Sequence, residues 1–485
     1  GKGAIVTSGE VTLNGGTFKR SAEKGNYSPN GNGGNSWYTI ANYGTMEINT
    51  GVTVENTGGY SSMIRNGGDV TADCNLTIEG GNFAGGINTV KNDSFGVLTI
   101  NGGNFSNTAQ YVIMNWNKAE ITAGTFRTLD TASAVLFTSA YGGDANTIGK
   151  LSISGGEFKH ASDTQEMIVD HYDETNKGNA VVTGGKFDAD ISKYIPTDYV
   201  QSADGTVEKL GETNAVAKVG GTYYKTLADA VAAAQDGDTI TLLKDAELTS
   251  TLNLAKNITI DGQGKYTIKA ANSFTVGSDN KTYCVLYVSG EVTLKDVTVN
   301  GNEKCRVIFC DKGKLTIDGA TITNGKASNF IGGVYMTSSA SFEMKSGSIT
   351  GNKNAKGYQN DEYLQYSSDL WIGANANGAL TAINGGTIGN VFVNANAWSA
   401  SNPGSFTMNG GTVTNLYVEH DANYGATLKY NDGTIEHLYL SKENGNGQSI
   451  EVTPVKGVIY NGGVKEQDLV TLTMKYNDGA TADST

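Results

Sequence analysis

Several residue types are scarce in this chain of 485 residues, and each scarcity excludes a class of structure. Only 4 prolines accompany 65 glycines, which is typical of turn-dense β structure and not of a proline-rich disordered chain. Only 4 cysteines are present, too few for a disulfide scaffold. No run of apolar residues approaches the length of about 18 that predicts a membrane-spanning helix.

Charge is also sparse, because charged residues make up 17% of the chain. The formal net charge of −14 excludes the basic face that nucleic-acid binding requires, and it disfavours anionic lipid surfaces. We therefore expect no nucleic-acid partner and no membrane span. Uncharged Asn, Thr, Ser and Gly take the place of charges in covering the surface.

A repeated phrase is the most informative feature that is present. It reads hydrophobic–Thr–hydrophobic–x–Gly–Gly–x–Phe, and successive copies start 21 to 35 residues apart. The copies run from Val11 to Phe18, Leu76 to Phe83, Leu98 to Phe105, Ala119 to Phe126, Leu151 to Phe158 and Ala180 to Phe187, with a looser copy from Met46 to Val54. A fixed phrase with variable spacers indicates a repeating structural unit that carries loops of different length.

Each phrase predicts a strand, a corner and a second strand. Leu98 and Ile100 alternate with polar residues, which is the period of a strand with one buried face. The Gly-Gly pair then supplies a bend, and Phe105 points inward again on the next strand. A unit this short buries its apolar face only by stacking on its neighbours. The sequence therefore predicts an all-β fold, a right-handed parallel β-helix with the phenylalanines in one internal column.

A second series replaces Phe with an aliphatic residue. Its copies run from Val292 to Val299, Leu315 to Ile322, Phe342 to Ile349, Thr381 to Ile388, Phe406 to Val413 and Leu428 to Ile435. Because the stacked residue changes, we expect two tandem β-helices. We place the first at 1–212 and the second at 213–470, and we interpret 471–485 as a following repeat or linker.

One segment, near 226–235, predicts a helix. Thr226 is a good N-cap, and Leu227, Ala230, Val231 and Ala234 share one apolar face. The end of a stacked fold exposes apolar side chains and unpaired backbone groups. We therefore expect this helix to cover the start of the second stack. Residues 188–213 are expected to close the first one.

The segment from Ala215 to Leu243 resembles the opening of pectate-lyase-like β-helix modules in large surface proteins of gut Firmicutes. The segment from Val470 to Gly479 is similar to the first strand of the internalin-type B-repeat that follows such modules. The resemblance implies a fold and a location on the bacterial cell surface, and it carries over no catalytic residue. It also implies that the sequence is a fragment of a longer secreted protein.

The four cysteines are expected to be buried free thiols. Cys74 lies in the first half, and Cys284, Cys305 and Cys310 lie close together in the second. A bridge from Cys284 to Cys305 or to Cys310, between adjacent coils, is the alternative.

An enzyme acting on polysaccharides is the alternative function, and residues suited to it are scarce. A lyase needs carboxylates that hold Ca²⁺ and an Arg or Lys as base, but only four arginines are present and Arg306 stands in an apolar run. A hydrolase of the polygalacturonase kind needs paired aspartates and a histidine, and its Asp-Asp and Gly-His-Gly elements do not occur. We expect Arg306 to form a surface ion pair, and we assign no catalytic residue.

A metal site is weakly indicated at His420, Asp421 and His437, whose segments would lie on neighbouring coils. The same residue types are expected on the polar rim of a stacked fold, which is the interpretation we favour. The nonapeptide that binds Ca²⁺ in other solenoids is not repeated. We therefore expect no cofactor and no obligatory metal.

Insertions rich in Tyr, Trp and Asn are the better candidates for function, because aromatic faces stack on sugar rings and amides bond hydroxyls. Loops on a rigid scaffold are also where binding residues gather. One insertion spans 26–38. The predicted ligand residues are Tyr358, Asp361, Tyr363, Tyr366, Trp371 and Trp398. Trp371 and Trp398 also lie beside strand-like runs and are equally candidates for core positions.

These observations favour a non-catalytic extracellular surface protein, an adhesin or stalk that presents loops to glycans or to host or matrix proteins. A β-helix polysaccharide lyase or glycoside hydrolase remains the alternative.

Overall fold

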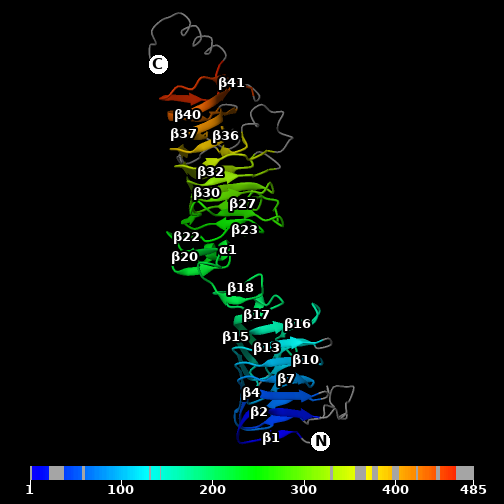
Figure 1. Ribbon diagram of the computed structural model, residues 1–485. Coiled ribbons are helices and arrows are strands. Elements are labelled where there is room, and N and C mark those ends of the chain that lie inside the picture. The colour runs from blue at the N-terminus through cyan, green and yellow to red at the C-terminus, as the bar shows by residue number, and fades with distance from the viewer. Residues whose placement is uncertain are drawn as a thin grey trace, which may run out of the picture. The chain divides into compact units, whose positions relative to one another are not determined.

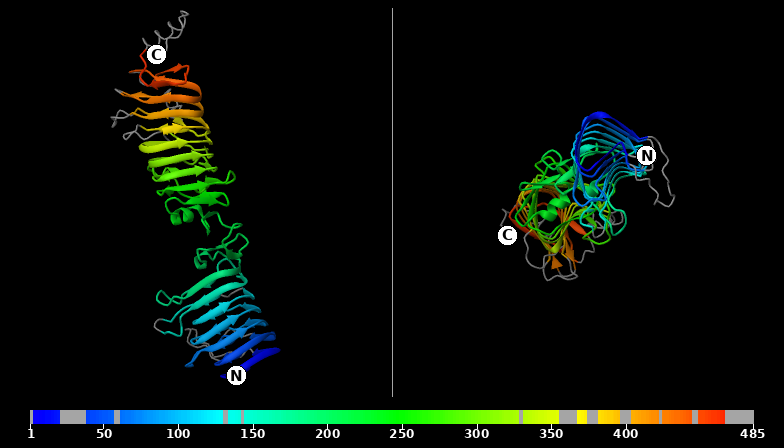
Figure 2. Two further views of the ribbon diagram at one scale, coloured as in Figure 1. Left: turned by 90° about the vertical axis from the view of Figure 1, so that its left-hand side faces the viewer. Right: turned by 90° about the horizontal axis from the view of Figure 1, so that it is seen from below.

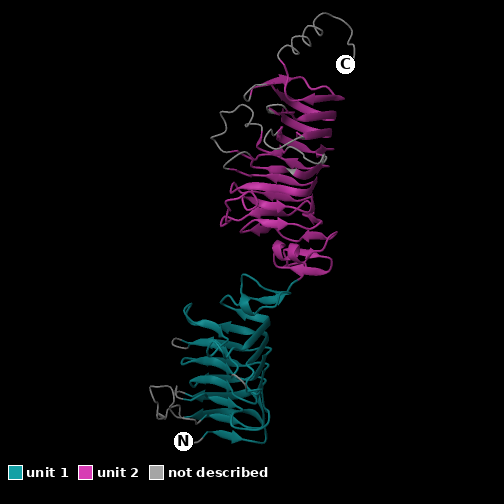
Figure 3. Cartoon of the chain, turned by 180° about the vertical axis from the view of Figure 1, so that it is seen from behind, with its two compact units in different colours: residues 1–210 teal, residues 211–485 magenta. Residues whose placement is uncertain are grey.

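The structure is a computed structural model, in which the chain divides into two compact units, Gly1–Leu210 and Gly211–Thr485 (Figure 3). The division comes after Leu210, whereas the repeats predict a boundary after residue 212. The structure describes residues 3–20, 38–56, 61–129, 133–141, 144–327, 331–354, 367–373, 381–395, 403–421, 424–443 and 448–465.

The described residues form an all-β fold in which neighbouring strands are predominantly parallel (Figures 1 and 2). In the first unit one sheet has seven strands. In sheet order these are β1 (Ile5–Thr7), β3 (Ile40–Asn42), β5 (Ile64–Asn66), β8 (Asn88–Asn92), β11 (Tyr111–Asn115), β14 (Ala134–Thr138) and β16 (Glu166–Val169).

The second sheet of this unit has ten strands and contains every copy of the Gly-Gly phrase. The strands are β2 (Glu10–Arg20), β4 (Thr45–Asn56), β6 (Cys74–Ile78), β7 (Asn82–Gly85), β9 (Gly96–Ile100), β10 (Asn104–Asn107), β12 (Lys118–Ile121), β13 (Thr125–Thr128), β15 (Lys150–Lys159) and β17 (Asn179–Phe187).

In the middle of this unit every third strand along the chain returns to the same position and pairs in parallel with its predecessor. β8 pairs with β11, β9 with β12, and β10 with β13. The phrase supplies two of the three strands, as predicted. The third strand lies in the spacer, where the sequence pattern did not reveal it.

The predicted phenylalanine column is present inside the first unit. Phe83, Phe105, Phe126, Phe158 and Phe187 are all buried, and adjacent ring centroids are 4.7, 4.9, 4.7 and 4.5 Å apart with nearly parallel planes. This spacing is the distance between neighbouring strands. Phe18 occupies the same column, but Val54 lies between it and Phe83.

The Gly-Gly corners adopt the conformation for which glycine was predicted. The second glycine of the pair has positive φ, for example +108° at Gly103 and +102° at Gly156. A side chain at Gly103 would also approach the Phe105 ring. Both constraints explain why the phrase tolerates only glycine there.

An unpredicted ladder of asparagines runs inside the sheet that contains β8 and β11. Asn42, Asn66, Asn92 and Asn115 are fully buried, and each side-chain amide donates to the next side chain at 2.8–3.0 Å, ending on Thr138. The amides also donate to backbone carbonyls, such as Lys118 O from Asn92. The ladder therefore provides hydrogen-bond partners for backbone carbonyls that would otherwise be buried without one.

The first unit ends in antiparallel and 3₁₀ structure. Its elements are η1 (Ser192–Tyr194), β18 (Tyr199–Gln201) and β19 (Val207–Lys209), and the two strands form a hairpin. Ile191 and Val207 are buried in the same core as the phenylalanine column. The segment predicted to close this stack thus contributes apolar side chains to its end.

The second unit is built around one continuous sheet. Its strands are β20 (Ala217–Val219), β21 (Thr222–Tyr224), β22 (Thr239–Leu242), β23 (Ala246–Leu248), β24 (Leu252–Leu254), β25 (Ile258–Asp261), β26 (Thr267–Ala270), β27 (Cys284–Val288), β28 (Glu291–Lys295), β29 (Thr298–Asn300), β30 (Arg306–Asp318), β31 (Thr321–Thr323), β32 (Val334–Met344), β33 (Ser348–Ile349), β34 (Leu370–Ile372), β35 (Thr381–Ile383), β36 (Thr387–Val393), β37 (Ser405–Val418), β40 (Thr427–Ser441), β41 (Ser449–Val452) and β42 (Val458–Asn461). A separate hairpin pairs β38 (His420–Asp421) with β39 (Tyr424–Gly425).

The aliphatic residues predicted to stack in this unit occupy successive partner positions in its parallel pairs. The register joins Val299, Ile322, Ile349, Ile388, Val413 and Ile435 in that order. All six are buried in one core. Replacing Phe by Ile or Val therefore changes the side chain in the column and keeps the stacking.

The predicted helix is α1 (Leu227–Ala233), with Thr226 as its N-cap accepting from the Asp229 backbone N–H at 3.0 Å. Leu227, Ala230 and Val231 are buried in the core of the second unit. Antiparallel strands stand at both ends of this sheet: β20 against β22, and β41 and β42 against β40. These antiparallel strands form hydrogen bonds with backbone groups that would otherwise be open to pairing with a further parallel strand.

Candidate functional site

Most of the ligand residues predicted from the sequence lie outside the described residues. These are Tyr358, Asp361, Tyr363, Tyr366 and Trp398. Trp371 is described and lies in β34, where it is half-buried.

Trp371 belongs to a column of aromatic side chains on the outer face of the second unit. The parallel register joins Tyr287, Phe309, Tyr335, Trp371, Phe392, Tyr417 and Tyr439, each flanked by core residues that point the other way. The Trp371 ring stacks on Phe392 at 4.2 Å and meets Tyr335 edge-on at 6.1 Å. Phe392 thus covers one face of the Trp371 ring.

Arg306 is buried beneath the same column, contrary to the surface ion pair that we expected. It is 1% exposed, its guanidinium lies over the rings of Tyr335 at 4.8 Å and Phe309 at 5.6 Å, and its Nε donates to Ile331 O at 3.1 Å. Burial lowers the pKa of Arg306. A substrate on the surface does not reach this side chain, so the position does not suit a catalytic base.

The histidines considered for a metal are held at different positions. In the strand register His437 is the partner of Asn415, which precedes His420 by five residues, so the two histidines are not paired. The His437 Nδ1 is 2.7 Å from Glu451 Oε1. The His420 ring lies against the backbone of Gly463, and His420 and Asp421 form the β38 strand. Among the residues that the structure describes, no group of three or more His, Cys, Asp or Glu is placed to hold a metal ion.

All four cysteines are buried free thiols, as expected from the sequence. Burial raises the pKa of Cys284, Cys305 and Cys310 to about 12. All three side chains are fully buried core residues, and thiols this weakly acidic are poor nucleophiles.

A concave site with an aromatic lining lies in the first unit, over the outer side of β8 and β11. It is a pocket of about 450 Å³, within the range of small-ligand sites. Its aromatic lining comes from Tyr38, Trp116 and Tyr141. Tyr38 ends the first insertion that the sequence singled out. Trp116 and Tyr141 lie in spacers and were not predicted, because single aromatics between strands look like ordinary loop residues.

Trp116 is the fixed centre of this aromatic group. It is 8% exposed and contacts Phe137 at 5.1 Å, and its backbone N–H donates to Asn92 O at 2.8 Å. Tyr141 and Tyr172, 57% and 63% exposed, reach its ring at 5.7 and 5.8 Å. Two exposed tyrosines from different loops thus meet at one anchored indole.

On the polar side of the pocket, two cations hold one carboxylate. Asp93 is 2.8 Å from Lys91 and 2.9 Å from Arg65, whose guanidinium also lies over the Tyr38 ring at 5.3 Å. Burial raises the pKa of Asp93, but the charges of Lys91 and Arg65 lower it further, and the net effect is a pKa below the usual value. The carboxylate is therefore ionised and neutralised in place.

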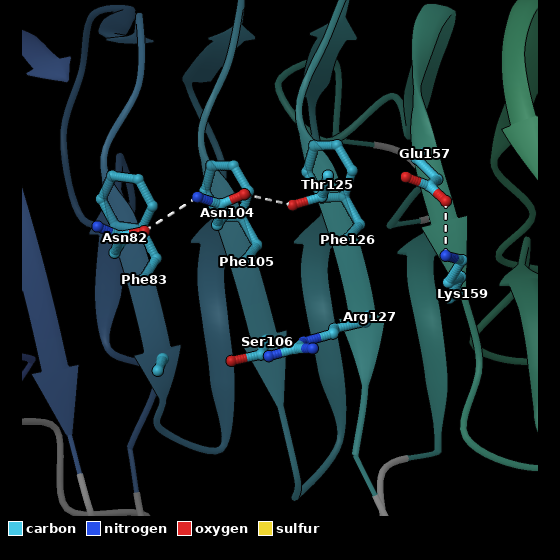
Figure 4. A pocket seen from close by; sticks show the side chains of 11 residues that line it. Asn82, Phe83, Asn104, Phe105, Ser106, Thr125, Phe126, Arg127, Glu157 and Lys159 are labelled. Carbon is cyan, nitrogen blue, oxygen red and sulfur yellow. Dashed lines mark hydrogen bonds and ion pairs between the residues drawn. The ribbon is translucent and has the colours of Figure 1, made fainter.

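A second pocket, of about 440 Å³, lies over β7, β10, β13 and β15 (Figure 4). Figure 4 shows Asn82, Asn104 and Thr125 side by side, and hydrogen bonds of 3.0 and 2.6 Å join them. Lys159 pairs with Glu157 at 2.6 Å, and Arg127 stands next to Ser106 in the strand register. The aromatic rings here belong to the buried phenylalanine column, where neighbouring rings stack on one another, so they are not free to stack on a ligand.

No protein-family model and no curated protein matches the chain. Within the described ranges, none of the helical structure has the length and apolar character needed to cross a membrane.

Proposed function

We propose that each unit is a right-handed parallel β-helix and that the chain is a non-catalytic module of a bacterial cell-surface protein, an adhesin or stalk. The regular recurrence of parallel strands and the ladders of Phe, Asn and Ile/Val support the β-helix. The resemblance of residues 215–243 to surface-protein modules supports the extracellular location.

The observation that carries the binding function is the pair of exposed tyrosines beside Trp116. Large aromatic side chains exposed together are uncommon on a soluble surface and mark places where ligands or partners bind. Here they project from loops on hydrogen-bonded ladders, which hold the binding groups in place without a ligand. The partners proposed are glycans or host and matrix proteins.

The test is binding of the purified chain to an array of glycans and extracellular-matrix proteins. We expect binding to at least one class, with a loss of about tenfold or more when Tyr141 and Tyr172 are both changed to Ala. Tyr424→Ala is the matched control, because Tyr424 is an exposed tyrosine of the second unit. A second variant, Tyr363→Ala with Tyr366→Ala, tests the insertion that the sequence favoured.

Two outcomes would contradict the proposal. One is a complete absence of binding across the array. The other is turnover of a polysaccharide, detected as new reducing ends or as ultraviolet absorbance of unsaturated products, which would favour the lyase or hydrolase alternative.

A further inference from the structure

We infer that the pocket lined by Tyr38, Trp116 and Tyr141 binds an uncharged saccharide, with Gln110 as a hydrogen-bonding partner for its hydroxyls. The inference rests on the proposed binding function and names the ligand class of that site. Three properties of the pocket lead to it: its rings, its charge and its amides.

The rings come first. The apolar face of a pyranose, made of C–H groups, packs on the face of an aromatic ring, and rigid tyrosine and tryptophan supply such faces at low cost in conformational entropy. Trp116 is held by Phe137 from within the protein, and Tyr141 and Tyr172 stand exposed beside it. A flat ligand ring therefore finds the exposed rings of Tyr141 and Tyr172 held against a largely buried indole.

The charge of the lining disfavours an anionic sugar. Among the described residues that line it, the charged ones are Lys91, Asp93 and Asp144. The Lys91 ammonium is already 2.8 Å from Asp93, and the neighbouring Arg65 is bound to the same carboxylate. A uronate or sulfate would meet Asp144 without gaining a free cation, whereas hydroxyl groups accept and donate freely in such a lining.

The amides supply the specificity. In the described structure the Gln110 side chain makes no hydrogen bond, although it lines the pocket and is half-buried. The neighbouring Asn88 is 3% exposed and donates to Ser62 Oγ at 3.1 Å, so it forms part of the pocket wall and is covered from a ligand. The unused Gln110 amide, which can both donate and accept, favours a ligand that brings several donors and acceptors, which is the character of a saccharide.

The experiment is a titration of the whole chain by isothermal calorimetry with the best neutral oligosaccharide from a glycan array, and with its sialylated, sulfated and uronate counterparts. We expect the neutral ligand to bind at least about tenfold more tightly than the acidic forms. Tyr141→Ala should weaken binding about tenfold, and Gln110→Ala about three- to tenfold. Tyr424→Ala should leave the affinity unchanged.

Three results would overturn the inference. Preference for the acidic forms would contradict the charge argument, and competition by choline would identify the pocket as an aromatic cage for a cation. Neutral-glycan binding that survives both pocket variants would place the site elsewhere and leave the proposed function standing. The proposed function itself fails if neither glycan nor matrix protein binds, or if the chain turns over a polysaccharide.

Discussion

Asparagine has two opposite environments in the first unit, although the side chains are chemically identical. Asn92 is fully buried and bonds to Asn66, Asn115 and backbone carbonyls inside the coil. Asn104 is exposed and bonds only to Asn82 and Thr125 on the outer face. A hydrogen bond to solvent replaces the outer contacts at little cost, whereas no water replaces the inner ones.

Asn92→Ala is therefore expected to lower the free energy of unfolding of the first unit by about 3 kcal/mol, because it removes one buried acceptor of the Asn66 amide and the buried amide donor to the carbonyl of Lys118. Asn104→Ala, the matched control, should change it by less than about 1 kcal/mol. Calorimetric unfolding of both variants measures the difference. Equal effects would contradict an energetic role for burial in the ladder.

At the scale of the element, the stacked phenylalanines act as a unit. Phe126 is 1% exposed and lies between Phe105 at 4.9 Å and Phe158 at 4.7 Å. Each ring fills the space over one coil and covers the rings on either side. A gap in the middle of the column therefore exposes two ring faces in addition to creating a cavity.

Phe126→Ala is expected to cost about 3–5 kcal/mol of stability in the first unit. Phe126→Leu, which restores most of the volume, should cost about 1–2 kcal/mol because the stacking is still lost. Phe18→Ala should cost less than Phe126→Ala, since Phe18 is only half-buried and pairs with Val54. Urea unfolding of the three variants ranks them. A larger loss at Phe18 would contradict the dependence on burial, and an unchanged stability in Phe126→Leu would show that stacking adds nothing to burial.

The strands and the helix could be predicted where the sequence has a strict local pattern. The strands that lie in the variable spacers could not. Alternation around Leu98 and the Gly102–Gly103 corner specified two strands and their stacking, and Thr226 with its apolar face specified α1. The third strand of each coil lies in spacers of variable length, so its asparagine ladder was missed. Its signal was the repeated ending of Ile-Ala-Asn42, Ile-Arg-Asn66 and Val-Lys-Asn92.

The candidate pocket was predictable only at its edge. Tyr38 belonged to an aromatic insertion that the sequence singled out, but Trp116, Tyr141 and Tyr172 come from three separate spacers. They meet because parallel pairing of β11 with β14 and of β14 with β16 brings the loops after these strands side by side. Which loops become neighbours depends on coil register, and one sequence does not reveal that for spacers of unequal length.

At the scale of the whole molecule, the two units have separate interiors. The core of the first contains residues from Ile40 to Val207, and the core of the second contains residues from Ala217 to Leu440. Neither core includes a residue of the other unit. Each unit also has its own terminal structure, the β18–β19 hairpin in one and α1 with β20 in the other.

Fragments 1–210 and 211–485 should therefore each fold alone, since the apolar surface that each buries lies within itself. We expect a β-type circular dichroism spectrum and a cooperative thermal transition from each fragment. Every residue assigned to the saccharide pocket is in the first fragment. The affinity of fragment 1–210 for the neutral ligand should therefore match that of the whole chain within about twofold, a smaller difference than the tenfold change that corresponds to 1.4 kcal/mol.

Binding retained by fragment 211–485 alone would instead place the ligand site in the second unit, where Tyr363 and Tyr366 are the candidates. Failure of fragment 1–210 to unfold cooperatively would contradict the independence of the two cores.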